Sequence, residues 1–423
     1  MTVHHQPEAG QPERLRIAYL FSEFPALTQA FALSDILALR DQGHVVSVHT
    51  VKAAPRDLDR RMALCGVPAD LPIQRPSLRG MFRWPDLLWR RWKIAVPLMT
   101  AVVRAAPRRP GVSLEALAVL PRILEIAEEV TSAQADVAHV FWARHAGMAL
   151  YALERSAPAV VRSTFAGAYD LVANDFLVDI CLATAEVVFT HAEANRDFLM
   201  GKGLARHSIA VVHRGIPVSL GAHGVGERDP NRWVTAAALV QEKNVQAVIR
   251  ALARERATRP QLTLRICGEG PWRPRLEALA DELGCASAVT FMGHLERSAV
   301  FREMSQAACF LLLSKKASER LPNVVKEALL AGCAVIASNT IGIRELIPDS
   351  GIGHVVDAED DAAIAAAINA VLHEDEAAAE ARRSRARTHI TQHFSTEASM
   401  RKYVRTWRSV RRTSQPSCAW PAR

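Results

Sequence analysis

Residues 319–338 read ERLPNVVKEALLAGCAVIAS and decide how the second half of the chain folds. Pro322 suits the first position of a helix, because the backbone N–H at that position has no helical partner. Gly332 is typical of the residue that ends a helix, and the apolar run 334–337 after it predicts a short buried strand. The stretch therefore predicts a loop, a helix of about ten residues and a strand.

The start of this helix predicts a binding site for an anion. The amides of Asn323 and Val324 belong to the first turn, where backbone N–H groups have no helical acceptor and attract negative charge. Glu319 lies just before the helix, and Glu327 lies more than one turn into it. Carboxylates do not hold a phosphate, but they accept hydrogen bonds from sugar hydroxyls. The pattern therefore indicates a phosphate group with sugar hydroxyls on either side.

The same stretch closely resembles the Glu-x7-Glu motif of the retaining glycosyltransferases of family 4, which have the GT-B fold. The resemblance implies an α/β protein whose two Rossmann-like, doubly wound domains face each other across a cleft. It also implies that Glu319 contacts the donor sugar and that Glu327 contacts the ribose. The alternative for Glu327 is a solvated helix glutamate. Arg320 stands where the family usually has glycine. The matching residues are Glu319, Pro322, Asn323, Glu327, Ala328, Ala331, Gly332, Val335 and Ile336.

Two further loops of the second half resemble donor-site loops of this family. Residues 237–244 match the family pattern G-R-L-V-x-x-K at Lys243, which implies a cation that stabilises the leaving diphosphate. Ala238 replaces the second family cation, an arginine. The other loop follows a predicted strand, and in the family it holds the base through its backbone. Its residues are Gly293, His294 and Leu295.

The first half begins with a strand, a helix and a strand, predicted over 15–21, 31–41 and 45–51. No glycine lies between Gly10 and Gly43, so a dinucleotide fingerprint is absent and an ordinary nicotinamide dehydrogenase is disfavoured. Residues 24–31, FPALTQAF, resemble the opening of bacterial colanic acid glycosyltransferases. The alternative is a plain strand–helix connection.

Two residues of the first half are candidates for the acceptor side. His139 matches a family histidine at the end of a strand, although a lone histidine is more often structural. Asp170 is the second candidate, as an acceptor-side or a structural residue. Gly167 occupies the position of a second family histidine, which normally lies near the donor sugar.

The net charge of +8 comes from one segment, residues 71–110, in which nine basic residues and one acidic residue give +8. Tryptophans and other large apolar side chains lie among the basic ones, and Pro97 is expected to stop or kink a helix there. Two interpretations stay open, an interfacial contact with an anionic membrane and a helical insertion packed on the domain. No nucleic-acid recognition fold accompanies the charge, so we expect no nucleic-acid partner.

The length of 423 residues suits two domains. Seven cysteines without a C-x-x-C pair and a polar N-terminus fit a cytoplasmic protein, with peripheral association at the inner membrane left open. The longest apolar run, Ile94–Val103, is too short to span a bilayer. The expected organisation is a disordered tail at 1–14, an acceptor-side domain at 15–220 with the insertion at 71–110, a linker at 221–232, a nucleotide-sugar domain at 233–390, a helix crossing back at 391–412 and a disordered tail at 413–423.

Taken with the resemblance, these residues predict a retaining glycosyltransferase of bacterial polysaccharide biosynthesis. The donor would be a UDP- or GDP-sugar and the acceptor a glycan or a lipid-linked glycan, without a metal or other cofactor. Gly167, Ala238 and Arg320 motivate a second hypothesis, a degenerate transferase that binds sugar nucleotide or glycan as a scaffold. A GT-B epimerase acting on the nucleotide sugar is a third.

Overall fold

The computed structural model describes residues 14–26, 30–77, 82–107, 109–167, 170, 175–222, 227–316, 319 and 321–414. The middle of the 24–31 motif, Arg320 and nearly all of both expected tails lie outside these ranges. The chain divides into two compact units. Unit 1 runs to Thr190 and also contains Asn195–Val212 and the chain from Met400 onward. Unit 2 contains His191–Ala194 and His213–Ser399.

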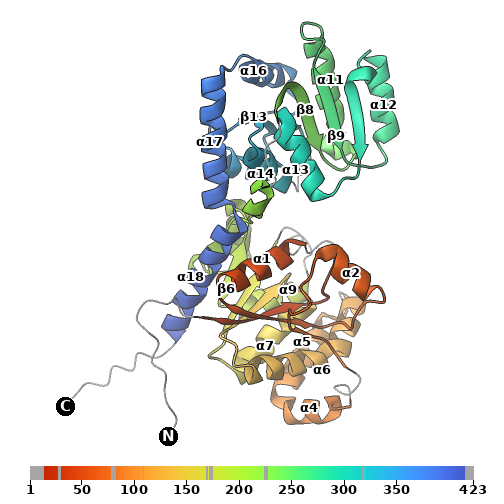
Figure 1. Ribbon diagram of the computed structural model, residues 1–423. Helices are drawn as coiled ribbons and strands as arrows, with labels where there is room; N and C mark the ends of the chain where they lie inside the picture. Colours follow the sequence, from red (N-terminus) through yellow and green to blue (C-terminus); the bar gives the residue numbers. More distant parts are fainter. Residues whose placement is uncertain are drawn as a thin grey trace, which may run out of the picture. The chain divides into compact units, whose positions relative to one another are not determined.

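Unit 1 is built on a parallel sheet in which the described strands follow the order β3-β2-β1-β4-β5-β6-β7 (Figure 1). The predicted strand–helix–strand opening is confirmed as β1, α1 and β2. The strands are β1 (Arg16–Phe21), β2 (Val45–Thr50), β3 (Ile73–Gln74), β4 (Val137–Phe141), β5 (Val161–Phe165), β6 (Val187–Thr190) and β7 (Ile209–Val211). The helices around this sheet are α1 (Ala30–Asp41), α2 (Leu58–Cys65), α4 (Trp84–Arg90), α5 (Trp92–Ala105), α6 (Pro110–Ser132), α7 (Met148–Ser156), α9 (Phe176–Thr184), α10 (Glu193–Gly201) and α18 (Thr396–Ser414).

Each face of this sheet carries its own apolar core, as expected for a parallel sheet covered on both sides. Helices α5, α6, α7 and α9 pack on one face. Helices α1 and α18 pack on the other face, so the end of the chain returns to the sheet made by its beginning. Phe189 of β6 stacks on Tyr403 of α18, with ring centroids 3.7 Å apart.

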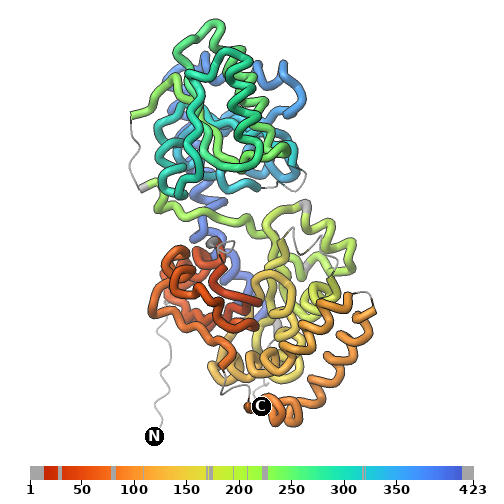
Figure 2. Tube along the Cα trace, turned by 90° about the vertical axis from the view of Figure 1, so that its right-hand side faces the viewer, coloured from red at the N-terminus to blue at the C-terminus, as the bar shows by residue number. Residues whose placement is uncertain are grey.

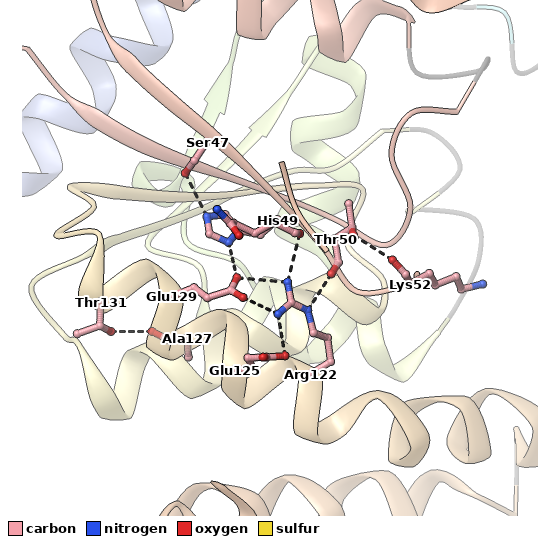
Figure 3. Close-up of polar contacts among 10 residues, drawn as sticks. Ser47, His49, Thr50, Lys52, Arg122, Glu125, Ala127, Glu129 and Thr131 are labelled. Carbon is pink, nitrogen blue, oxygen red and sulfur yellow. Dashed lines mark hydrogen bonds and ion pairs between the residues drawn. The ribbon is translucent and has the colours of Figure 1, made fainter. Parts of the chain in front are cut away.

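A buried arginine joins α6 to the sheet (Figure 3). Arg122 donates to the carbonyl of Thr50 at 3.0 Å and to Glu129 at 2.6 Å. His49, which precedes Thr50 in β2, contacts the same carboxylate at 2.7 Å. Burial favours the neutral acid, but the hydrogen bonds from His49 and Arg122 outweigh it and lower the pKa of Glu129. Arg122 therefore provides a hydrogen-bond donor for the carbonyl at the end of β2, and its own buried charge is paired with Glu129.

The segment 71–110 packs on unit 1 through one of its sides, as the insertion interpretation predicted, while contact with a membrane stays a prediction. Helices α4, α5 and α6 lie together (orange in Figure 2), and α5 continues through Pro97 instead of stopping there. One side of the segment is buried in the core of unit 1, through Leu87, Ile94, Ala95, Leu98 and Val102. The other side exposes Phe82, Trp89, Trp92, Val96, Met99 and Val103. Within the described residues, no helix has the length and apolarity needed to cross a bilayer.

Unit 2 holds the second parallel sheet, whose described strands follow the order β10-β9-β8-β11-β12-β13. They are β8 (Asp229–Ala236), β9 (Thr263–Cys267), β10 (Val289–Gly293), β11 (Ala307–Leu312), β12 (Ala334–Ser338) and β13 (His354–Val356). Its helices are α11 (Val245–Arg256), α12 (Arg273–Glu282), α13 (Arg297–Gln306), α14 (Asn323–Ala331), α15 (Ile343–Leu346), α16 (Asp361–Leu372) and α17 (Glu376–His393). Helices α11, α12 and α16 pack on one face and α13, α14 and α17 on the other.

The structure differs from the sequence expectations at several boundaries. Strand β8 begins inside the expected linker 221–232, at Asp229. Apart from the short segment His191–Ala194, the chain passes between the units at 212/213 and 399/400, whereas the sequence suggested 220 and 391. Helices α13 and α17 were not predicted, because both have polar and charged residues around most of their circumference.

Candidate functional site

The candidate site lies at the carboxyl edge of the unit 2 sheet. The strand order reverses between β8 and β11, because β9 and β10 extend the sheet on one side and β12 and β13 on the other. Ligands of open parallel sheets bind at the carboxyl ends of the strands next to such a switch point. The loops that leave β8 and β11 there contain Lys243 and Glu319.

Lys243 and Glu319 form an ion pair between Nζ and Oε2, although they are 76 positions apart. The loop of Lys243 is fixed by its neighbour Glu242, whose carbonyl accepts hydrogen bonds from the Lys315 amide at 2.8 Å and the Ser314 hydroxyl at 3.3 Å. Both side chains of the pair are largely buried, 16% and 12% exposed. The structure thus brings together the two residues proposed to act at the donor sugar and its leaving group.

Helix α14 forms as predicted, with Pro322 one position earlier than expected, as the N-cap. The first hydrogen bond of its opening turn runs from the Val325 amide to the Pro322 carbonyl at 3.1 Å. The amides of Asn323 and Val324 therefore precede the helical hydrogen-bond ladder. Gly332 ends the helix with a φ of +83°, the left-handed conformation that the sequence predicted.

Glu327 is a buried residue of α14, which excludes the solvated-helix alternative. Its Oε1 accepts a hydrogen bond from Nε of Arg297 at 2.7 Å. Burial raises the pKa of Glu327, while the charge of Arg297 and its hydrogen bond oppose that rise. Arg297 is the first residue of α13, and no signal in the sequence identified it.

The expected base-binding loop leads directly into α13, whose first residue, Arg297, pairs with Glu327 of α14. Gly293 ends β10 with a φ of +71°, and its carbonyl accepts a hydrogen bond from the Gly268 amide at 2.8 Å. His294 is exposed and Leu295 is half-buried; α13 starts two residues after Leu295, at Arg297. The loop expected to hold the base and the carboxylate expected to bind the ribose are therefore connected through Arg297.

The two glycines of the neighbouring turn allow a close backbone approach. A Cβ atom on Gly268 would lie 1.9 Å from the carbonyl oxygen of Ala237, and one on Gly270 would lie 2.4 Å from that of Leu239. Both glycines therefore pack against the start of the loop that carries Lys243.

The acceptor-side candidates lie in unit 1 and have structural partners. His139 is buried in the middle of β4, where Nδ1 lies 3.0 Å from Ser163 Oγ and Trp407 donates to the same hydroxyl at 2.9 Å. Aromatic rings surround it, which is the packing of a structural histidine, and the acceptor-side role stays a prediction. Those rings are Tyr19, Phe189, Tyr403 and Trp407.

Asp170 is also buried, and its carboxylate accepts the Gly167 amide at 2.9 Å. Burial raises its pKa to about 6, against opposing hydrogen bonds from the backbone of Gly167 and Ala143. A Cβ atom on Gly167 would lie 3.2 Å from the ring of Phe165. The space at residue 167 is therefore tight for a histidine in this conformation.

Comparisons with known proteins agree with this geometry. Residues 225–388 match the family described as "Glycosyl transferases group 1". A glycogen synthase of Mycobacterium tuberculosis is 32% identical over 198 residues, which cover 46% of this chain and 47% of that protein. The chain thus spans about half the length of this curated relative. A putative colanic acid biosynthesis glycosyltransferase of Salmonella typhimurium, WcaL, is 22% identical over 91% of this chain and 97% of its own.

A solved structure of HepE from Anabaena in complex with UDP aligns with nearly the whole chain. The TM-score is 0.63 at 16% identity, and the alignment covers 93% of this chain and 100% of HepE. This similarity shows the fold, GT-B, with two Rossmann-like domains built on parallel sheets. The predicted fold class is confirmed.

Proposed function

Because the chain carries a glycosyl transferases group 1 domain on a GT-B fold, we propose that it is a retaining glycosyltransferase of polysaccharide biosynthesis. It would move a sugar from a nucleotide diphosphate sugar to a glycan or a lipid-linked glycan. The observation that carries this proposal is the ion pair of Lys243 and Glu319 at the edge where α14 begins. The match to WcaL and the UDP in the HepE structure support the polysaccharide and nucleotide classes.

In this proposal the diphosphate lies against the first turn of α14. The amides of Asn323 and Val324 donate to its oxygens, and Lys243 supplies a positive charge. Glu319, which holds Lys243, accepts hydrogen bonds from the donor sugar, while Glu327 binds the ribose and the backbone of Gly293, His294 and Leu295 binds the base. Fixed donors of this kind stabilise charge that develops on the leaving oxygen.

The reaction breaks the bond between the anomeric carbon and the diphosphate oxygen, and the bonding electrons leave with the diphosphate. The acceptor hydroxyl then attacks from the face that the diphosphate leaves, so the anomeric configuration is retained. The acceptor proton passes to the departing diphosphate. The scheme assigns charge stabilisation to Lys243 and the helix amides and uses no metal.

The exposed side of segment 71–110 supports an acceptor held at a membrane. Trp89 is 80% and Trp92 56% exposed, and Lys93 Nζ lies 5.9 Å from the ring centroid of Trp92. Exposed tryptophans beside basic side chains suit the interface of an anionic bilayer. We propose that this side contacts the membrane surface on which a lipid-linked acceptor is anchored.

A donor screen with membrane extract tests the function. The protein is incubated with UDP- and GDP-sugars, and the release of nucleoside diphosphate is measured with and without extract. Release that needs both a donor and the extract is the expected result. Conversion of a donor into an isomeric nucleotide sugar without extract, and without release of nucleoside diphosphate, would point instead to an epimerase.

A second candidate is a sugar-nucleotide-binding scaffold, and two replacements favour it. Ala238 removes one family cation, and Gly167 removes a family histidine. A scaffold would bind the donor but release no diphosphate with any acceptor preparation. The Lys243–Glu319 pair favours the enzyme, because a scaffold does not need a cation at the leaving group.

A further inference from the structure

Lys326 is a fully buried lysine in the first turns of α14, next to Glu327. Its ammonium group donates a hydrogen bond to the carbonyl oxygen of Arg214 at 2.6 Å and another to Oδ1 of Asn323 at 3.1 Å. Nζ also lies 5.9 Å from the ring centroid of Phe394. Nothing in the sequence motif or in the proposed chemistry assigns it a role.

Helix stability does not explain this residue. A cation near the N-terminus of a helix faces the positive end of the helix dipole, and a buried ammonium loses its hydration. An apolar side chain of similar length, such as methionine, would fill the same space without either cost. The role of Lys326 therefore depends on the two groups to which it donates hydrogen bonds, the Arg214 carbonyl and the Asn323 side chain.

One of these groups, the carbonyl of Arg214, lies beside a backbone segment that is hydrogen-bonded within unit 2. Arg214 precedes Gly215 and Ile216, and the Ile216 amide donates to the Phe394 carbonyl at 2.8 Å. The Thr396 amide donates back to the Ile216 carbonyl at 3.0 Å. A Cβ atom on Gly215 would lie 2.2 Å from the backbone of Ser395, so the two segments touch directly. These backbone contacts therefore hold the carbonyl of Arg214 in place.

The other group is the side-chain amide of Asn323, whose orientation Lys326 determines. Lys326 donates to Oδ1 of Asn323, and in its charged form it can only donate, so the amide presents its oxygen to Lys326. The NH2 group of Asn323 is then on the opposite branch of the amide. Asn323 is half-buried and is the first residue of α14, where the backbone amides also point out of the helix.

We propose that Lys326 is a positioning residue of the donor site, which turns the Asn323 side chain so that its two N–H donors face the donor's diphosphate. The inference rests on the proposed function. The diphosphate is bound by three groups of one helix end, two backbone amides and one oriented side-chain amide. Lys326 does not touch the ligand and acts through Asn323.

The first test is a double-mutant cycle. The affinities for UDP and GDP are measured by calorimetry at pH 6, where Lys326 carries its proton, for the wild type, Lys326→Met, Asn323→Ala and the double variant. Each single change is expected to weaken binding of the preferred diphosphate roughly tenfold. The double variant is expected to bind no more weakly than the weaker single variant, because both changes remove one interaction. Losses that simply add would overturn the inference.

The corresponding nucleosides, uridine and guanosine, separate positioning from general damage. They lack phosphate, so their affinity is expected to stay the same in all four proteins. An equal loss for nucleoside and diphosphate would mean that Lys326 only supports the fold. A wild type that binds neither UDP nor GDP would instead overturn the proposed function itself.

Asn323→Asp provides a test that does not disturb the buried lysine. Aspartate keeps an oxygen for Lys326 and suits the first turn of a helix, so the variant is expected to fold with at least wild-type stability. It replaces the NH2 group with a second oxygen, which repels phosphate. Diphosphate binding is expected to fall more than in Asn323→Ala. Binding equal to that of the wild type would contradict the orientation proposed for the amide.

Discussion

Arg297 Nε lies 2.7 Å from Oε1 of Glu327 and joins the first residue of α13 to the middle of α14. The loop that precedes Arg297 is the one expected to hold the base, and Glu327 is the residue expected to bind the ribose. The contact would therefore keep the two parts of the proposed nucleoside site in register. It also supplies the charge that limits the rise in the pKa of the buried carboxyl.

Glu327→Gln is expected to weaken nucleotide binding by about 1.5–3 kcal/mol, because a hydrogen bond to a charged group is lost. Calorimetry with UDP and GDP measures this change. The matched control is Glu303→Gln, another glutamate of this unit paired with an arginine, since Arg265 lies 3.0 Å from it. The ribose role would be refuted by equal affinities in both variants.

Lys243→Met is expected to lower the rate of diphosphate release roughly 10²–10³-fold, the usual loss when one fixed donor to a developing charge is removed. Donor affinity should change much less than the rate, because the charge grows only in the transition state. Lys315→Met serves as the control, because that lysine pairs with Glu359 at 2.8 Å and stands in the neighbouring loop. Unaltered turnover in the Lys243 variant would remove Lys243 from the mechanism.

Gly268→Ala is expected to destabilise the protein by roughly 2 kcal/mol or more, since the new Cβ would collide with the Ala237 carbonyl. Its φ of +151° is also unfavourable for a residue with a side chain. Urea denaturation measures the loss. Gly111→Ala is the control, because no atom lies within 4 Å of the added Cβ. A variant as stable as the wild type would mean that the backbone of this turn differs from the one described.

The buried lysine predicts a pH dependence of stability. Burial, together with the charge of Arg214, lowers the pKa of Lys326 to about 7; Glu327 opposes this shift and Arg297 adds to it. Between that value and about 10.4 the unfolded chain keeps a proton that the folded protein has lost. The wild type should therefore gain about 1 kcal/mol per pH unit relative to Lys326→Met over this range.

Denaturation of both proteins at pH 7.5 and at pH 9 checks this sign. The stability difference should shift toward the wild type at the higher pH. If it stayed constant, Lys326 would not titrate in this range.

Replacing Arg90, Arg91 and Lys93 with glutamine is expected to weaken binding to vesicles of anionic lipid, since each basic residue near such a surface contributes about 1 kcal/mol. Sedimentation with vesicles at low salt measures the change. The control removes the same charge from exposed arginines of unit 2, Arg250, Arg275 and Arg302. If both triple variants lost vesicle binding equally, the loss would reflect net charge alone. The segment would then be a packed insertion without a membrane contact of its own.

Local signals in the sequence were sufficient for much of the fold. Pro322 and Gly332 bound α14 because their backbone preferences act within a few residues, and the apolar runs marked most strands for the same reason. Helix α17 could not be predicted in this way, because its charged residues are spread around the helix and its buried side is narrow. The apolar and basic residues of 71–110 were visible, but only packing separated buried Leu98 from exposed Met99.

By itself the sequence determined the parallel α/β architecture, the helix that opens at Pro322 and the residues that match the Glu-x7-Glu motif, because these depend on neighbours along the chain. Only the tertiary structure decided which side chains from distant parts of the chain come into contact. Arg297 reaches Glu327 over 30 positions, Lys326 reaches Arg214 over 112, and His139 is enclosed by rings from α18. Such contacts depend on how helices pack on a sheet, and local sequence preferences carry no information about that packing.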